Sequence, residues 1–275
     1  MAVKSDSCQS SSSVEVRSPH PAIRFPDRSG RDLQAVLHEA DAGTVIELAP
    51  GRYEGPLNLR RPVTLKGAGD LTRLVSLDGP AVTIAPEGTE LVFLESLALE
   101  GPEGIRVRQG RVRLYNVHVT GARGHGSGGG LAVEGGEVEG ALVRIEDCTA
   151  ARGGGLAAYH RARVVLRDAQ FRECEAETGG ALWLANEARV DLVGATLAQV
   201  RARRHAGGQA MWLGDPQGEG PCSRLERVRF EDAPFGRPLV MEPEGAGRVV
   251  VVECDLPSDV SRISGVVDDG NNRWR

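Results

Sequence analysis

The sequence predicts an all-β protein, a right-handed parallel β-helix of about eight coils with a short N-terminal capping helix. Three observations predict this fold. A glycine-glycine turn recurs at steps of 25, 26 and about 28 residues. Short apolar runs with the alternation of strands follow each copy of the turn. No helical periodicity occurs inside the repeat, and a period of this length without helices is typical of a solenoid of stacked strands.

The N-terminal segment, residues 1–27, is polar and serine-rich and lacks apolar periodicity, so we expect a disordered tail. A short helix should follow, because Leu33, Val36, Leu37 and Ala40 recur at helical spacing. Ser29 and Asp32 form a capping-box-like start, and Gly43 suits the position after the helix. This helix should cover the open apolar end of the first coil.

The β-helix domain is expected to span residues 28–260, and residues 261–275 read as a polar C-terminal tail. The glycine-glycine turns lie at 128–131, 153–156 and 179–182, with a weaker copy at 207–211. The strand that follows each glycine strand is predicted at 91–94, 112–115, 142–145, 164–167, 190–193, 225–230 and 249–253. Cys148 and Cys174 are 26 residues apart, so they should lie one above the other on adjacent coils.

Composition excludes several classes of protein. The net charge of −5 argues against a nucleic-acid binder. No apolar run approaches the ~18 residues of a membrane span, and no apolar leader is present, so we expect a cytoplasmic protein with no membrane partner, with a non-Sec export route left open. The five cysteines form no C-x-x-C pair and should be buried and reduced, and neither a metal nor a cofactor is predicted.

Arginine dominates the basic residues: Lys4 and Lys66 are the only lysines, so 31 of the 33 basic residues are arginine. Arginine forks suit carboxylate or phosphate ligands. The other interpretation is a GC-rich genome, whose codons favour arginine, alanine and glycine together.

One stretch, GTVIELAPGRYEGPLNLRRPVTLKGAG at Gly43–Gly69, resembles the N-terminal coils of pectinesterases. The GGGL and GGAL turns are similar to the repeats of autotransporter-type β-helices. The chain therefore resembles the right-handed parallel β-helix superfamily, the pectin-lyase-like fold. That resemblance implies the architecture but no single activity, because the fold hosts esterases, lyases, hydrolases, epimerases and inert spikes.

The catalytic motifs of those enzymes are missing. The coils contain no Gln-Asp pair of the pectinesterase kind, and Gly124-His125-Gly126 lacks the aspartate cluster that accompanies it in polygalacturonases. Asp147, Asp168 and Asp191 are dispersed over different coils, unlike a calcium-binding carboxylate cluster. We therefore predict no catalytic residues and no pectinesterase or polygalacturonase turnover.

An aromatic stripe is predicted on the outer surface. Tyr159, Trp183 and Trp212 should face outward on successive coils, beside Arg106 and Glu134. Flat rings with polar neighbours suit sugar stacking. In the alternative, a loop or the tail with Trp274 covers the stripe, which is then a small satellite core.

A basic ridge is predicted in the turns before the glycine strands. Its members are Arg201, Arg203, Arg204 and His205, with Arg123, His125 and Arg152 on lower coils. The ridge could bind an acidic glycan or a partner's carboxylates. It could equally be a solvated face that Glu173, Glu175 and Glu177 neutralise.

The function predicted first is a non-catalytic module that binds a polysaccharide or a protein partner. A related prediction is a solenoid that binds protein partners within a cytosolic system. The alternative is a polysaccharide-active enzyme with a divergent site around His125, Glu134, Tyr159 and His160. The candidate binding residues are Tyr159, Trp183, Trp212, Arg106, Glu134, His125, His160 and Arg204.

Overall fold

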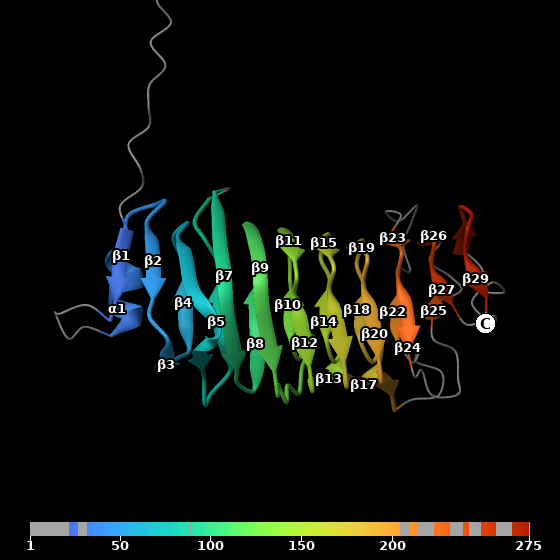
Figure 1. Cartoon of the computed structure of the whole chain (residues 1–275), viewed down its shortest axis with the longest axis horizontal. Coiled ribbons are helices and arrows are strands. Elements are labelled where there is room, and N and C mark those ends of the chain that lie inside the picture. The colour runs from blue at the N-terminus through green and yellow to red at the C-terminus, as the bar shows by residue number, and fades with distance from the viewer. Residues whose placement is uncertain are drawn as a thin grey trace, which may run out of the picture.

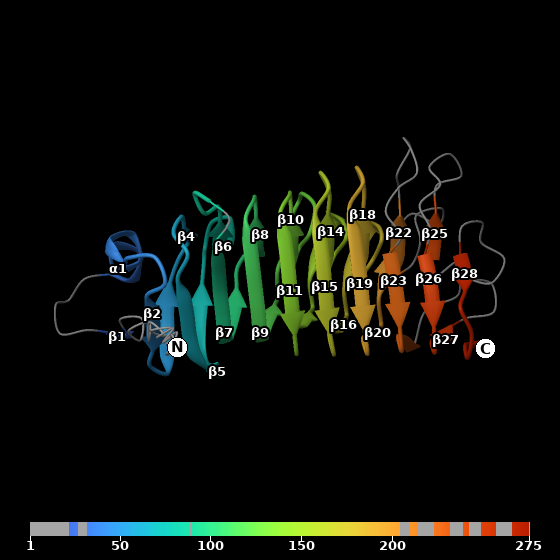
Figure 2. The ribbon, with the colours of Figure 1, turned by 90° about the horizontal axis from the view of Figure 1, so that it is seen from above.

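The structure is a computed structural model, and it describes residues 22–26, 32–88, 90–203, 210–213, 223–231, 239–241, 249–256 and 266–274. These residues form a parallel β-helix, an elongated stack of coils with one helix at its N-terminal end (Figure 1). Every pairing between neighbouring strands of the stack is parallel, and each strand pairs with its copy on the next coil (Figure 2). The predicted fold class is confirmed.

Each complete coil contributes one strand to each of three long faces, and faces 2 and 3 carry additional strands at the ends of the stack. Face 1 is an eight-stranded sheet, so eight coils of the described chain carry a face 1 strand, in line with the predicted number of about eight. Its strands are β4 (Leu57–Leu59), β6 (Pro80–Ile84), β8 (Glu103–Val107), β10 (Leu131–Val133), β14 (Leu156–Ala158), β18 (Leu182–Leu184), β22 (Met211–Leu213) and β25 (Leu239–Met241).

Faces 2 and 3 belong to one hydrogen-bonded sheet of 18 strands. The strands β5 (Thr64–Val75), β7 (Leu91–Glu100) and β9 (Arg111–Thr120) bend from face 2 into face 3. The other strands of face 2 are β1 (Ala22–Phe25), β2 (Val45–Leu48), β11 (Glu137–Ala141), β15 (Arg163–Arg167), β19 (Arg189–Val193), β23 (Ser223–Glu226), β26 (Val249–Val252) and β28 (Val266–Asp268).

The other strands of face 3 are β3 (Gly51–Glu54), β12 (Arg144–Glu146), β16 (Gln170–Arg172), β20 (Thr196–Ala198), β24 (Arg229–Glu231), β27 (Asp255–Leu256) and β29 (Arg273–Trp274). A short face 4 joins face 3 back to face 1 over three coils, with β13 (Thr149–Arg152), β17 (Glu175–Thr178) and β21 (Arg201–Ala202).

Single residues in the left-handed conformation make the corners between faces 2 and 3. Asn116, Leu142 and Asp168 occupy equivalent places on successive coils, with φ of 51°, 56° and 51°. A positive φ turns the chain sharply in one residue, and asparagine and aspartate tolerate it better than leucine. Leu142 was predicted to begin the strand 142–145. It is instead this corner residue and is 44% exposed, because the second strand of its coil is β11.

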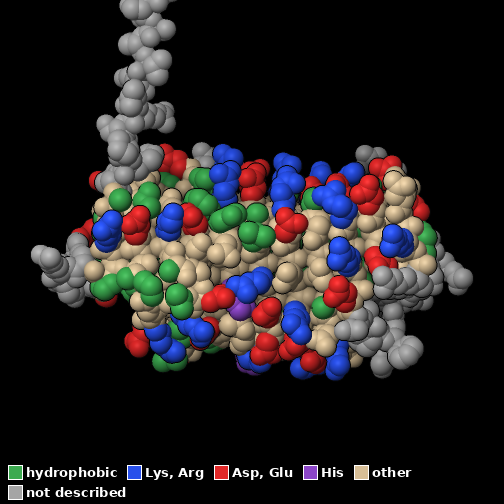
Figure 3. Space-filling view, viewed as in Figure 1, with side chains coloured by type: hydrophobic (Ala, Val, Ile, Leu, Met, Phe, Trp, Pro, Cys, Tyr) green, Lys and Arg blue, Asp and Glu red, His purple; other side chains and the backbone are tan. Residues whose placement is uncertain are grey.

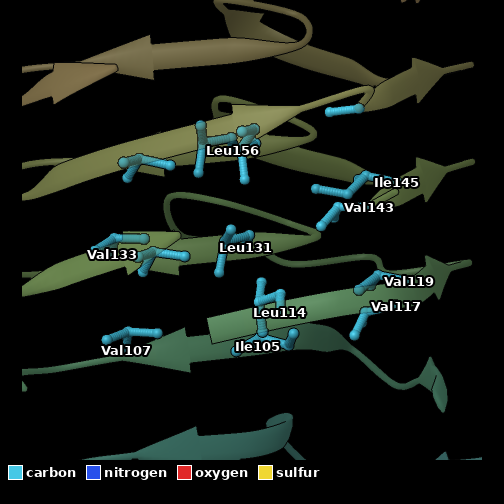
Figure 4. Packing of buried hydrophobic residues seen from close by; sticks show 14 of the residues in the cluster. Ile105, Val107, Leu114, Val117, Val119, Leu131, Val133, Val143, Ile145 and Leu156 are labelled. Atoms are coloured by element: carbon cyan, nitrogen blue, oxygen red, sulfur yellow. The ribbon is translucent and has the colours of Figure 1, made fainter. Parts of the chain in front are cut away.

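The core lies inside the coils and consists of columns of aliphatic side chains. Ile105, Leu131 and Leu156 follow one another along face 1, and Val119 and Ile145 do so along face 3 (Figure 4). All five are at most 1% exposed. Alternation of inward and outward residues along each strand produces these columns, because equivalent positions recur every coil.

The N-terminal end is covered as predicted by helix α1 (Leu33–Glu39), which buries Leu33, Val36 and Leu37. Asp32 is the N-cap, and its carboxylate accepts a hydrogen bond from the Ala35 N–H at 2.6 Å. Ser29 of the predicted capping box lies outside the described residues.

Both predicted tail boundaries are wrong. The strand β1 lies inside the predicted tail of residues 1–27, pairs with β2 along its whole length and buries Phe25. At the other end, β28 and β29 pair with β26 and β27, and Trp274 packs against the main core. These strands were missed because they are only two to four residues long. Residues 1–21 and 257–265 lie outside the described residues.

Three cysteines, Cys148, Cys174 and Cys254, are free and buried. The flanking pairs Glu146–Arg172 and Thr149–Glu175 place Cys148 and Cys174 one above the other on adjacent coils, as predicted. Cys8 and Cys222 lie outside the described residues.

The buried thiols should react slowly with a thiol reagent. Burial raises the pKa of Cys148 to about 11 and that of Cys174 well above its usual value. The thiolate is the reactive species. In the folded protein at pH 8, Ellman's reagent should therefore modify these two thiols only on unfolding, as mass spectrometry of the labelled peptides can show. Modification of both within seconds would contradict their burial.

Candidate functional site

Four predicted site residues, Arg106, Glu134, Tyr159 and Trp183, come together on the outer surface of face 1. Arg106 lies in β8, and its guanidinium pairs with Glu103 at 2.5 Å and lies 3.7 Å from Glu134 through Nε. That Nε is buried and has no hydrogen-bond partner. Glu134 follows β10 and also lies 4.0 Å from Arg108. Two carboxylates therefore bracket one arginine.

Tyr159 closes this group. Burial raises the pKa of its phenol to about 12, and the charge of Glu134 and a hydrogen bond to it add to the effect. A phenol with so high a pKa stays protonated near neutral pH, so it serves as a hydrogen-bond donor and not as a base.

The predicted stripe of three exposed rings does not form as expected. Trp183 is only 9% exposed and packs with Ala157, Ala185 and Tyr159 in a small cluster outside the main core. The Arg152 guanidinium lies over its ring at 5.2 Å. Tyr159 does not lie in the same column of side chains as Trp183, because the strand register pairs Trp183 with Ala157. The rings of Tyr159 and Trp183 nevertheless meet edge to face, with 6.1 Å between their centroids. The Trp183 ring is part of a small satellite core, as in the alternative, but Trp274, which the alternative placed over it, packs against the main core.

The remaining predicted residues are scattered or not described. His160 is exposed and touches the Tyr159 ring at 5.0 Å between centroids. His125 is exposed in the turn between β9 and β10. The backbone of Trp212 pairs with that of Trp183, but its side chain lies outside the description, as does Arg204.

Two arginines of the predicted basic ridge are neutralised by acidic neighbours, while Arg204 and His205 lie outside the described residues. Arg203 pairs with Glu175 at 2.5 Å, and Arg123 pairs with Asp147 at 2.6 Å. Basic and acidic side chains alternate in the same way over the surface seen in Figure 3. Exposed pairs of this kind contribute little to stability and leave little charge for a ligand.

A groove with a volume of ≈ 500 Å³ lies on face 2. It crosses β9, β11, β15, β19 and β23. Its floor contains Ala141, Val165 and Val193, with the half-exposed ring of Tyr115 at one side. Its walls carry four arginines, Arg113, Arg163, Arg167 and Arg224, and two acidic residues, Glu139 and Asp191.

The four arginines differ in what they already bind. Arg113 pairs with Glu139 at 3.2 Å and Arg224 with Glu226 at 3.3 Å, while Asp191 pairs with Arg189 at 2.8 Å. Among the described residues, the exposed guanidiniums of Arg163 and Arg167 have no ion pair or side-chain hydrogen bond. They lie at the two ends of β15, on either side of Val165. The groove therefore keeps two free positive charges above an apolar floor.

A third polar group lies on face 3. His118 of β9 contacts Asp70 through Nδ1 and Glu146 through Nε2, both at 3.1 Å, and Arg144 donates to both oxygens of Asp70 at 2.9 and 3.0 Å. The two carboxylates lie on opposite sides of the ring, so they cannot share one cation. No cluster of three or more potential metal ligands occurs within the part of the chain that the structure describes.

Sequence reasoning missed both the groove and the His118 group. The groove had a signal, because arginine recurs at one position of three repeats, at Arg111, Arg163 and Arg189. The arginine bias was instead attributed mainly to codon usage. The His118 group had no such signal, since Asp70 and Arg144 are 74 residues apart.

Comparisons of the chain with protein-family models, with curated proteins and with solved structures give no match. Across the described residues, no helix has the length and apolar character needed to cross a bilayer. The case for function therefore rests on the geometry of these three surface groups.

Proposed function

We propose that the protein is a non-catalytic β-helix module that binds an acidic polysaccharide in the groove of face 2. The observation that carries the proposal is the pair of guanidiniums of Arg163 and Arg167, which have no ion-pair partner within the described part of the chain and lie above the apolar floor of a ≈ 500 Å³ groove. Pockets that bind small groups combine an apolar lining with a few polar groups that fix orientation.

The groove supplies the two kinds of contact that an acidic sugar chain needs. Arginine forks bind carboxylates through paired hydrogen bonds. The five residues of β15 from Arg163 to Arg167 are four steps of about 3.3 Å, so the two arginines lie about 13 Å apart along the strand, enough for more than one sugar ring. The Tyr115 ring and the side chains of Val165 and Val193 offer an apolar surface to the C–H faces of the sugars.

Calorimetric titration with oligosaccharides of polygalacturonate, alginate and hyaluronate tests the proposal, with neutral dextran oligosaccharides for comparison. We expect at least one acidic series to bind with a micromolar to millimolar Kd. Tyr115→Ala should weaken that binding by about fivefold, because one ring contact contributes on the order of 1 kcal/mol. Absence of binding by every acidic series would overturn the proposal.

A second candidate function, a polysaccharide-active enzyme, is favoured by the group on face 1. Glu103 and Glu134 flank Arg106, and paired carboxylates are the groups that cleave glycosidic bonds. Incubation of the same polymers with the protein would release reducing ends or unsaturated products if this function holds, and Glu134→Gln would abolish the release. We expect no release, because Arg106 holds both carboxylates.

We also propose a superfamily and a cellular location for the protein. Membership of the right-handed pectin-lyase-like superfamily is supported by the parallel coils and by the resemblance of Gly43–Gly69 to pectinesterase coils. A cytoplasmic location is supported by the free, buried thiols, which suit a reducing compartment.

A further inference from the structure

Val165 lies in the floor of the face 2 groove, and charged side chains surround it in two directions. Along β15, Arg163 precedes Val165 by two residues and Arg167 follows it by two. Across the coils, the strand register places Glu139 beside Val165 on one neighbouring strand and Asp191 beside it on the other. Val165 is therefore flanked by two cations along its strand and by two carboxylates across it.

The side chains around Val165 all line the groove. The two residues of β15 that alternate with them, Val164 and Leu166, are fully buried in the core. Alternation along a strand therefore turns Arg163, Val165 and Arg167 outward. A residue advances about 3.3 Å along a strand, and neighbouring strands lie about 4.8 Å apart, so the Cα atoms of the two acids are nearer to Val165 than those of the two arginines. A ligand group above Val165 lies between two acidic residues.

Other partners hold the two acids in the groove wall. The Glu139 carboxylate accepts one described hydrogen bond, from Arg113 at 3.2 Å. The Asp191 carboxylate accepts from the Nε of Arg189 at 3.0 and 3.1 Å and from the Arg224 N–H at 3.1 Å. Among the residues that the structure describes, neither acid pairs with an arginine of β15, so both of those arginines keep their donors for a ligand. A carboxylate has about four lone-pair sites, so Glu139 can accept further hydrogen bonds from sugar hydroxyls.

We propose, on the basis of the binding function put forward above, that the polysaccharide of this groove is one in which acidic sugars alternate with neutral sugars. A neutral sugar lies over Val165, and the acidic sugars on its two sides reach Arg163 and Arg167. The hydroxyls of the neutral sugar donate to the carboxylates of Glu139 and Asp191. A third carboxylate in that place would face two like charges, and such a juxtaposition lowers affinity and rejects the wrong ligand.

A uniformly acidic chain is the competing ligand. It carries more negative charge per unit length, so attraction by the four arginines of the groove wall would by itself favour it over an alternating chain. Simple charge attraction and the arrangement around Val165 therefore predict opposite orders of affinity.

Calorimetric titration of the whole protein with hexasaccharides of hyaluronate, polygalacturonate and alginate, at one ionic strength, measures this order. Hyaluronate alternates a uronate with a neutral N-acetylated sugar, whereas every unit of the other two is a uronate. The hyaluronate hexasaccharide should bind about tenfold more tightly than either of the others. Equal or tighter binding of polygalacturonate or alginate would overturn the alternating ligand and leave the binding function standing. No binding by any of the three would overturn both.

Glu139→Gln tests the cause of the preference, measured as the ratio of the Kd for polygalacturonate to the Kd for hyaluronate. The substitution removes one carboxylate beside Val165 and keeps the size of the side chain, so the ratio should fall from about tenfold to about threefold or less.

Glu137→Gln is the matched control. Glu137 lies in the same strand and pairs with Arg111 at 3.5 Å, as Glu139 pairs with Arg113, but it lies outside the groove lining. Each substitution frees one arginine, and only Glu139→Gln removes a charge beside Val165, so the control should keep the wild-type ratio. Thermal melts confirm that both variants are folded. A ratio that is the same in Glu139→Gln as in the wild type, or that falls equally in both variants, would overturn the proposal.

Discussion

Replacing Gly154 with alanine should lower the free energy of unfolding by about 3 kcal/mol or more, the upper part of the range for overpacked sites. A Cβ at this position would lie 2.5 Å from the carbonyl oxygen of Glu175, 2.6 Å from that of Gly180 and 2.7 Å from the Glu175 nitrogen. All three atoms are backbone of the next coil. They cannot move without breaking the pairing between coils, so the strain remains in the folded state.

Gly126→Ala is the matched control for this substitution. Gly126 lies in a turn of the preceding coil, and a Cβ there would meet no atom within 4 Å. Its replacement should change the free energy of unfolding by less than about 0.5 kcal/mol. Urea denaturation followed by circular dichroism measures both variants. Equal stabilities would show that the coils do not approach each other at Gly154 as described.

Trp183→Ala should cost about 3 kcal/mol of stability, the lower end of the range for a buried tryptophan, because the ring lies at the surface of the solenoid and not in its centre. The loss comes from the contacts with Ala157, Ala185 and Tyr159. A thermal melt checks it, and Tyr115→Ala serves as control because Tyr115 is 44% exposed and its removal should cost less than about 1 kcal/mol.

The same variant decides between the two interpretations of the aromatic cluster. If Trp183 packs as a satellite core, the variant is destabilised and keeps its affinity for acidic oligosaccharides. An undiminished melting temperature together with lost sugar binding would restore the exposed sugar-stacking stripe.

The sequence predicted the fold because its strongest signals are local and repeated. The glycine turns at 128–131, 153–156 and 179–182 fall at the entry to β10, β14 and β18, where the backbones of adjacent coils approach closely. Strand β11 was not predicted, because its sequence at Glu137–Ala141, Glu-Val-Glu-Gly-Ala, contains only one large apolar residue. There Gly140 leaves room for Leu166 and Val143, which fill the core in its place.

The candidate sites were harder to predict because they depend on register across coils. The predicted column of rings would need Tyr159 to lie directly beside Trp183 on the next coil. In the structure Ala157 takes that place, and Tyr159, two residues further along the chain, contacts the Trp183 ring diagonally. The groove needs Arg163 and Arg167 to be free while Arg113, Arg189 and Arg224 are paired, and only the spatial positions of the carboxylates decide that.

The central claim, that the free arginines of the groove bind an acidic sugar chain, is tested most directly by one calorimetric comparison. Wild type and the double variant Arg163→Gln/Arg167→Gln are titrated with the acidic oligosaccharide that binds best, beside a control double variant, Arg52→Gln/Arg229→Gln, whose exposed arginines lie outside the groove. Each hydrogen bond to a charged group contributes about 1.5–3 kcal/mol. The groove variant should therefore bind at least tenfold more weakly, with the control unchanged. Equal affinity for all three proteins would contradict the claim.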